Sequence, residues 1–263
     1  MERRGLPLSL STEYLHYEPF IKSLPLKSRY EPADLPVPDL LIDREGELEM
    51  FYAPHNEYRN SSASLLIVGI TPGWTQMELA YRTAKLALEQ NKSADEVCKA
   101  AKIAARFSGA MRRNLMQMLD SLKLPEYFGL PDSEALFAEN NPLLHTTSLL
   151  KYPVFVAGKN YTGHKPPLAG NAFLHNFALK FIKAELKLLH KPLIIPLGKT
   201  VETMLKELVS SKELGDTLED KRCLWGFPHP SGANGHRHKQ FADAREQMEA
   251  KVAAFAAERS GLA

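Results

Sequence analysis

The chain has few cysteines, no long hydrophobic run and little net charge. Its 263 residues include two cysteines, Cys98 and Cys223, too few for a four-thiolate iron–sulfur cluster or a zinc site built on cysteines. No apolar stretch approaches the roughly 20 residues of a membrane-spanning helix, and no signal-peptide pattern is present. We therefore expect a cytoplasmic protein, of a prokaryotic cytosol, with no membrane attachment, no metal and no other cofactor.

The charge balance limits the kind of partner that the chain can bind. The net charge is +2 and the isoelectric point about 8.4, less basic than a protein that coats nucleic acid. Any contact with nucleic acid should therefore be local. A hydrophobic content of 44% over this length suffices for one substantial core, and one domain is the simpler expectation.

Strand-like and helix-like segments alternate along the chain. Buried strands are expected at residues 65–68, 145–150, 192–197 and 223–227, and helices at 77–89, 93–105, 114–122, 173–189, 201–208 and 239–258. This alternation predicts a three-layer α/β/α sandwich with a central, mainly parallel, four-stranded sheet. Residues 1–60, rich in proline and aromatics, are expected to form an N-terminal arm packed on the core of a 61–263 domain.

A histidine between two prolines is the most distinctive feature of the sequence. Pro228 and Pro230 hold His229 on a stiff turn, because proline fixes φ and removes a backbone donor. Small residues and a basic cluster at 236–239 (HRHK) follow. Such a segment can approach a ligand closely and bind phosphate groups.

A second motif lies far upstream. The apolar run at 65–68 (LLIV) leads into GITPG at 69–73, and the later motif reads HPSGAN at 229–234. The two motifs together resemble those of the uracil-DNA glycosylase superfamily, whose first motif takes forms such as GINPG and whose second takes forms such as HPSAAL or NPSG. LGKT at 197–200 also fits this pattern, and the resemblance covers about residues 60–245.

The resemblance implies an active site for base excision. It makes His229 and Thr71 the catalytic residues, with His229 donating a hydrogen bond to the base O2 as negative charge develops there. The alternative for His229 is that it only braces a proline-rich turn. The residues implied to bind the base are Gly69, Ile70, Gly73, Phe107 and Ser148. The alternative for Phe107 is a place in the core.

The resemblance also implies contacts to DNA. Ser231 would support the loop or contact a phosphate, and Ala233 or Asn234 would lie where the family inserts a side chain into the base stack. The full set of expected DNA-binding residues is Ser231, Gly232, Ala233, Asn234, His236, Arg237, Lys239 and Lys165. Arg112 and Arg113 could extend the phosphate track or simply form a solvated helix face. The two helices within about 77–105 look like an insertion beside the pocket mouth.

Three positions depart from the family pattern and bear on the substrate. Thr71 replaces the Asp or Asn that positions water, unless Glu78, His145 or His164 supplies the missing group. Ser148 replaces the Asn that reads the base edge. Gly73 replaces a Tyr that excludes C5 substituents, which leaves room for a larger base unless Trp74 closes it.

These departures favour one function and leave others open. We expect a monofunctional, monomeric DNA glycosylase that flips out a damaged or C5-modified pyrimidine, such as a hypermodified phage cytosine, and leaves an abasic site. A general uracil-DNA glycosylase and a catalytically weak DNA-binding member are the alternatives. A metal hydrolase built on the histidines at 229, 236 and 238 is less favoured, because no carboxylate accompanies them. A nucleotide triphosphatase is also less favoured, because its phosphate-binding loop requires a glycine at the position that Leu193 occupies here.

Overall fold

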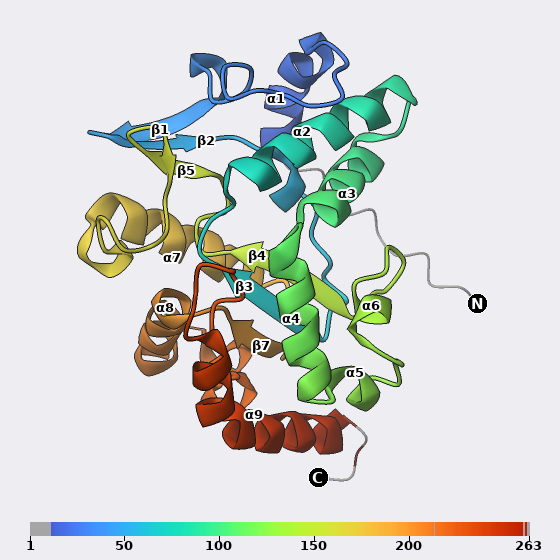
Figure 1. Cartoon of the computed structure of the whole chain (residues 1–263), viewed down its shortest axis with the longest axis vertical. Coiled ribbons are helices and arrows are strands. Elements are labelled where there is room, and N and C mark those ends of the chain that lie inside the picture. The colour runs from blue at the N-terminus through green and yellow to red at the C-terminus, as the bar shows by residue number, and fades with distance from the viewer. Residues whose placement is uncertain (1–11, 213, 260, 262–263) are drawn as a thin grey trace. The chain divides into compact units, whose positions relative to one another are not determined.

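The computed structural model describes residues 12–212, 214–259 and 261, which fall into two compact units. Unit 1 comprises residues 1–59, 73–106 and 152–160, and unit 2 comprises 60–72, 107–151 and 161–263. We describe each unit by itself (Figure 1). The arm boundary expected near residue 60 falls at the end of the first unit 1 segment, and unit 1 also takes in the helices expected at 77–105.

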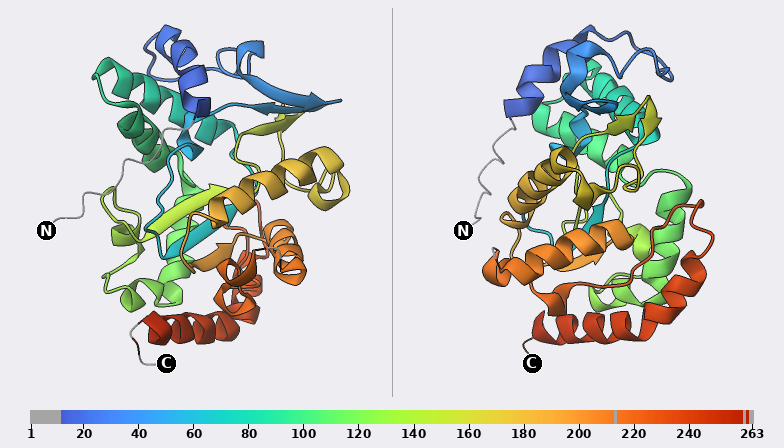
Figure 2. Two further views of the ribbon diagram at one scale, coloured as in Figure 1. Left: turned by 180° about the vertical axis from the view of Figure 1, so that it is seen from behind. Right: turned by 90° about the vertical axis from the view of Figure 1, so that its left-hand side faces the viewer.

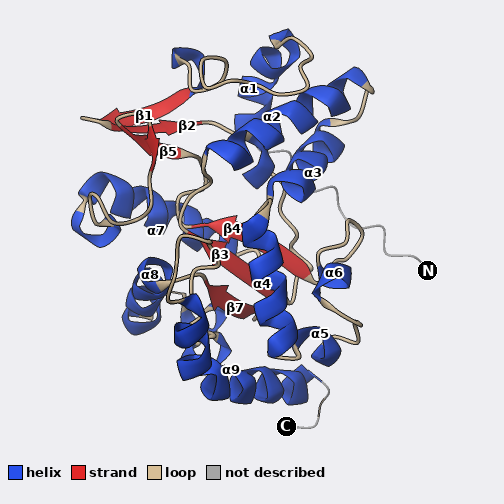
Figure 3. Cartoon of the chain, viewed as in Figure 1, coloured by secondary structure: helices blue, strands red, loops and turns tan. Residues whose placement is uncertain are grey.

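Unit 2 is built on a parallel three-stranded sheet. Its order is β4 (Leu144–Ser148), β3 (Leu65–Gly69), β7 (Leu193–Pro196), and Gly69 pairs with Ser148 at the carboxyl end of β3. All residues of these strands are buried, as the uninterrupted apolar run in β3 predicts. Figure 3 shows the three strands in red among the helices of the unit.

The fourth parallel strand expected at 223–227 is a single bridge rather than a strand. Cys223 pairs with Ile194 in parallel, and Leu224 N–H donates to the Ile194 carbonyl at 2.9 Å. Trp225 N–H then bonds back to the Cys223 carbonyl at 3.0 Å, and Gly226 takes a φ of 80°. This turn removes the chain from the sheet edge, so the expected pairing stops after one residue.

Helices cover both faces of the unit 2 sheet, which gives the three layers. On one face, Leu65 and Ile67 share a core with side chains of α4 (Ala110–Ser121), α5 (Leu124–Tyr127), α6 (Ser133–Leu136) and α9 (Arg237–Arg259). On the other, α7 (Ala172–Leu186) contacts β4 through a bond of 2.6 Å between His145 Nε2 and Glu185 Oε2. Helix α8 (Lys199–Ser211) directly follows β7. These elements can be followed in Figure 2.

Unit 1 contains a small antiparallel sheet and three helices. The strand order is β1 (Leu41–Glu45), β2 (Leu48–Phe51), β5 (Val154–Val156), β6 (Lys159–Asn160). The helices are α1 (Thr12–Ser23), α2 (Trp74–Glu89) and α3 (Ala94–Ala105). A capping box starts α3, in which Ser93 N–H donates to Glu96 Oε2 at 2.8 Å. The β1–β2 hairpin lies within the expected N-terminal arm, where no strand was expected.

Short 3₁₀ turns connect the regular elements of both units. They are Pro38–Leu40 and Pro54–Asn56 in unit 1, and Leu168–Gly170, Gly215–Thr217 and Asp220–Arg222 in unit 2. The expected helices all form, with ends displaced by a few residues. No helix within the described ranges is both long and apolar enough to cross a membrane.

Both cysteines are free thiols in the interior. Cys98 lies in α3 and Cys223 at the edge of the unit 2 sheet, and both are buried. Burial raises the pKa of the Cys223 thiol to about 12. The thiolate form is therefore scarce at neutral pH.

Candidate active site

Three of the expected base-binding residues meet at the carboxyl edge of the unit 2 sheet. A Cβ added to Gly69 would lie 3.4 Å from Phe107 Cε1 and 3.5 Å from Ser148 Oγ. A Cβ at this position would make ordinary van der Waals contact with both, so the backbone of Gly69 lies directly beside the two side chains. Ligands of parallel α/β sheets bind at this edge, so the grouping is suited to hold a planar ring.

Phe107 has a strained backbone and contacts in two directions. Its φ is 49°, in the left-handed region that non-glycine residues rarely adopt. The side chain is half-buried and packs against the unit 2 core as well as beside Gly69. The core role weighed for this residue and the base-stacking role are therefore compatible. Strain of this kind is retained where the surroundings fix a side chain in place.

Thr71 has a half-buried hydroxyl near the carbonyl of the next residue. The distance from Oγ1 to the Pro72 oxygen is 3.4 Å. Two of the three residues considered as substitutes for a water-positioning carboxylate are buried and have polar partners: Glu78 forms an ion pair with Arg82 in unit 1, and His145 forms a hydrogen bond with Glu185 in unit 2. His164 is exposed and lies close enough to His229 to affect its charge.

The ring of His229 is held in one tautomer. Ser231 N–H donates to His229 Nδ1 at 3.3 Å, so the neutral ring carries its proton on Nε2. Burial, and secondarily the neighbouring imidazole of His164, lower the pKa of His229 below its ordinary value. At neutral pH the residue is a neutral Nε2–H donor, the form that can stabilise a developing oxyanion without transferring a proton.

Backbone contacts fix the segment that carries His229. We call residues 226–236 the His229 loop. Asn114 Nδ2 of α4 donates to the Pro230 carbonyl at 2.8 Å, and Asn234 Nδ2 donates to the His229 carbonyl at 3.2 Å. Gly198 N–H, at the end of β7, donates to the Phe227 carbonyl at 2.9 Å. These bonds attach the loop to the end of the sheet on one side and to α4 on the other.

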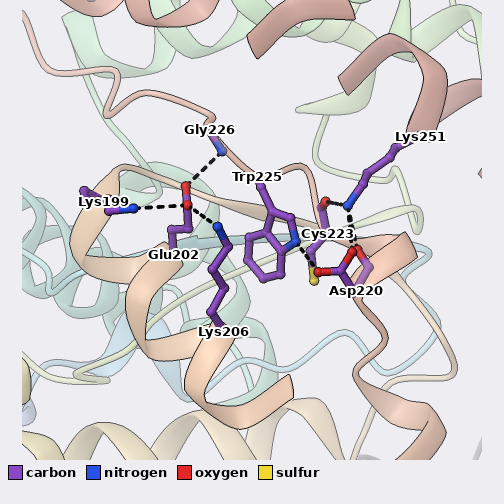
Figure 4. A network of polar contacts seen from close by, with 8 residues as sticks. All are labelled: Lys199, Glu202, Lys206, Asp220, Cys223, Trp225, Gly226 and Lys251. Atoms are coloured by element: carbon purple, nitrogen blue, oxygen red, sulfur yellow. Dashed lines mark hydrogen bonds and ion pairs between the residues drawn. The ribbon is translucent and has the colours of Figure 1, made fainter. Parts of the chain in front are cut away.

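A polar network holds the start of the His229 loop (Figure 4). Glu202 Oε2 accepts from Gly226 N–H at 2.9 Å, while its Oε1 accepts from Lys206 at 2.7 Å. Burial acts to raise the pKa of Glu202, but the hydrogen bonds from Lys206 and Gly226 outweigh it, so the pKa is lowered. Asp220 accepts from Trp225 Nε1 at 2.7 Å. The carboxylates thus fix the backbone before and at the turn.

The expected DNA-binding residues of the His229 loop differ in how firmly they are held. Ser231 Oγ accepts from Ala233 N–H at 3.2 Å, a local turn. Asn234 is tied back to His229 and to Gln240, whereas Ala233 is exposed. Of the two residues considered for insertion into the base stack, Ala233 is the accessible one. Gly232, His236, Lys239 and Lys165 are exposed, and Arg237 is half-buried at the first turn of α9.

The room expected beside Gly73 is occupied. Gly73 caps α2 in unit 1, and a Cβ added there would lie 3.3 Å from Cγ and Oδ1 of Asn160. Asn160 is held by Trp74 N–H, which donates to its Oδ1 at 2.8 Å. The neighbour of this glycine is thus neither open space nor the Trp74 side chain but the amide of Asn160 in β6. Within unit 2, the side chain of Ile70 packs closely on Gly163, because its Cδ1 would lie 3.1 Å from a Cβ added to that glycine.

Sequence reasoning missed Gly198, Asn114 and Asn160. Gly198 was visible as part of LGKT, but its contact with His229 depends on two segments meeting in space. The two asparagines lie in no motif, so nothing in the sequence indicated their partners. Over the described residues, no group of three or more His, Cys, Asp or Glu side chains is placed to hold a metal ion.

Comparison with known proteins places these motifs in a family. The family model described as Uracil DNA glycosylase superfamily matches residues 56–254. "Uncharacterized protein YoxB" of Bacillus subtilis (strain 168) is 46% identical over 243 residues, 90% of this chain and 93% of that protein. A solved structure, the wild-type SMUG2 of Pedobacter heparinus, aligns with a TM-score of 0.45 and 14% identity, over 94% of this chain and 98% of that one. The extent of the family match shows that the chain belongs to the uracil DNA glycosylase superfamily.

Proposed function

We propose that the chain is a monofunctional DNA glycosylase for a damaged or C5-modified pyrimidine. It would act as a monomer, flip the base out of the duplex, hydrolyse the N-glycosidic bond with water and leave an abasic site. Membership of the superfamily supports the reaction class. The choice of base is our inference from the residues at the site.

The observation that carries this proposal is the fixed tautomer of His229. Leaving-group departure places negative charge on the base, and a neutral donor already aimed at that charge lowers the barrier without reorganisation. Ser231 N–H supplies the bond that sets the tautomer, and burial keeps the ring neutral. The half-buried His229 packs on Gly198, which follows β7, and Gly69 and Ser148 lie at the carboxyl ends of β3 and β4 in the same parallel sheet.

The residues around the base favour relaxed selection rather than strict uracil recognition. Ser148 offers a hydroxyl, which can donate or accept, so it discriminates less sharply between uracil and cytosine edges than an amide. Thr71 brings no carboxylate to the water, which favours a slower reaction on ordinary uracil. A hypermodified cytosine, as carried by some phages, would suit these features.

Base release from defined duplexes tests the proposal. The substrates are duplexes with uracil, 5-hydroxymethyluracil or glucosylated 5-hydroxymethylcytosine, and the product is the abasic site, cleaved by alkali. We expect release of a C5-modified base, lowered about 100- to 1000-fold in His229→Ala, the loss typical of removing one oxyanion donor. His190→Ala is the matched control, because His190 is exposed and precedes β7 at the opposite edge of the sheet.

The other outcomes distinguish the alternatives. Release of uracil alone would reject the modified-base substrate in favour of a general uracil-DNA glycosylase. Tight, salt-sensitive binding of every duplex without abasic product would identify a DNA-binding member that lacks catalysis, which the absence of a carboxylate at Thr71 favours as the second candidate.

A further inference from the structure

Unit 1 contains a pocket that the proposed reaction does not use. Its volume is about 430 Å³, within the range of small-molecule sites. The lining is mostly apolar and aromatic, with a carboxylate, an ammonium and an amide at its rim: Pro32, Pro36, Glu49, Phe51, Trp74, Phe155, Gly158, Lys159 and Asn160. All of these residues belong to unit 1.

The pairing of three strands places the polar and aromatic groups in one row. Glu49 of β2 pairs with Phe155 of β5, and Phe155 pairs with Asn160 of β6. Residues directly opposite one another in adjacent strands point to the same face of a sheet. Phe51, two residues after Glu49, shares that face because strand side chains alternate. A carboxylate, an aromatic ring and an amide thus stand side by side above the sheet.

The aromatic walls of the pocket are rigid. The rings of Phe51 and Phe155 meet edge to face, with centroids 5.9 Å apart and planes at 68°. Both are buried, whereas Trp74 is half-buried and is the first residue of α2. Walls of this kind accept a flat ring by stacking, at little cost in side-chain entropy.

The polar groups at the rim suit a ring that carries both a carbonyl and an N–H. Asn160 Oδ1 is engaged by Trp74 N–H, so its Nδ2 is left to donate to a carbonyl and has no partner among the described residues. Glu49, whose nearest cation is Arg44 at 4.0 Å, can accept from a ring N–H. Lys159 is exposed and can meet a phosphate or a carbonyl. These donors and acceptors are complementary to the carbonyl and N–H groups on the edge of a nucleobase.

We infer that this pocket binds a nucleobase, at a site lined by unit 1 alone. The base could come from a free nucleoside or from an unpaired position in a DNA strand, because both present the same ring. The inference goes beyond the proposed reaction and can hold even if base release is never detected.

Trp74 itself can report the binding. The chain contains two tryptophans, so in Trp225→Phe the fluorescence comes from Trp74 alone. We expect saturable quenching by thymidine or by a thymidine octanucleotide, and none by an octamer of abasic residues. Quenching by thymidine assigns the source to free nucleosides, and quenching by the octanucleotide alone assigns it to DNA. Equal quenching by the abasic octamer, or none by any ligand, would overturn the inference.

Variants of the lining give a second measurement. Trp74→Leu should weaken binding about 10- to 100-fold, measured by calorimetry on the otherwise unchanged chain, as expected for loss of one base–aromatic stack. Asn160→Ala should weaken it less. Leu86→Ala, an exposed leucine on the same helix, is the control and should bind normally. If Trp225→Phe does not fold, NMR of the ¹⁵N-labelled wild-type chain answers the same question. Of its two indole N–H resonances, only that of Trp74 should shift when the ligand is added. Unchanged affinity in both lining variants would reject the site.

Discussion

Gly198 and His229 touch across the end of the unit 2 sheet. A Cβ at Gly198 would lie 3.0 Å from the Cβ of His229, and Gly198 has a φ of 84°. A side chain there would face both a steric clash and an unfavourable backbone conformation. The glycine of LGKT therefore acts as a positioning residue for His229, not as part of a phosphate-binding loop.

The first prediction concerns this contact. Gly198→Ala should destabilise the fold by about 1–3 kcal/mol and lower kcat for base release more than it raises KM, because His229 is displaced from the leaving group. Urea denaturation and steady-state kinetics measure the two effects. Gly235→Ala is the control, since a Cβ there meets nothing within 4 Å. Equal behaviour of the two variants would refute the positioning role.

The second prediction concerns pH. Burial and then His164 hold the pKa of His229 below its ordinary value, so activity should persist below pH 6.5 and fall as the pH drops through the folded-state pKa. In His164→Ala, loss of the electrostatic effect of this imidazole should raise the pKa of His229 and move the acid limb of the kcat profile to higher pH. Ring resonances of His229 followed by NMR provide the check. An unmoved acid limb would contradict the coupling.

The dependence of the free energy of unfolding on pH tests the lowered pKa of His229 independently. Because the folded pKa of His229 is lowered, the unfolded chain binds more protons between the two pKa values, and this residue costs stability as the pH falls below about 6.5. His164→Ala should reduce that loss. His190→Ala should leave it unchanged.

The third prediction concerns the reading of the base edge. Ser148 lies beside Gly69 in unit 2, so Ser148→Asn should raise kcat/KM for uracil about tenfold relative to a C5-modified cytosine, because an amide presents both a donor and an acceptor to the base. Ser210→Asn, at an exposed serine of α8, serves as the control. Parallel changes on all substrates would mean that residue 148 supports the fold and does not select the base.

The fourth prediction concerns Glu202 at the start of the His229 loop. Its folded pKa is lowered, so its contribution to stability is complete above the ordinary pKa of about 4.3 and is lost as the pH falls through the folded-state value. Glu202→Ala leaves the half-buried Gly226 N–H without its acceptor and should cost about 1–3 kcal/mol at pH 7. The deficit should shrink in acid. Glu246→Ala, on the exposed side of α9, should cost little by the same denaturation assay.

Local patterns made the core of the fold predictable, whereas contacts between distant segments did not. The apolar run at 65–68 predicts a buried strand because a strand in a parallel sheet is covered on both faces, so all of its side chains lie in the interior. The prediction of a fourth strand was wrong because the turn at Trp225 ends the pairing after one residue. The β1–β2 hairpin was not predicted because the prolines around it obscure the strand pattern. Asn160 could not be found at all, since its role depends on reaching Gly73 from another segment.

The two interior thiols have a practical consequence for following DNA by spectroscopy. Maleimide reagents attack accessible thiolates, and the burial of Cys98 and Cys223 withholds both from such reagents. A cysteine introduced at the exposed Ala233 would therefore take up a fluorophore selectively in the otherwise native sequence. Because both native cysteines are buried, a single introduced cysteine in the His229 loop can be labelled selectively.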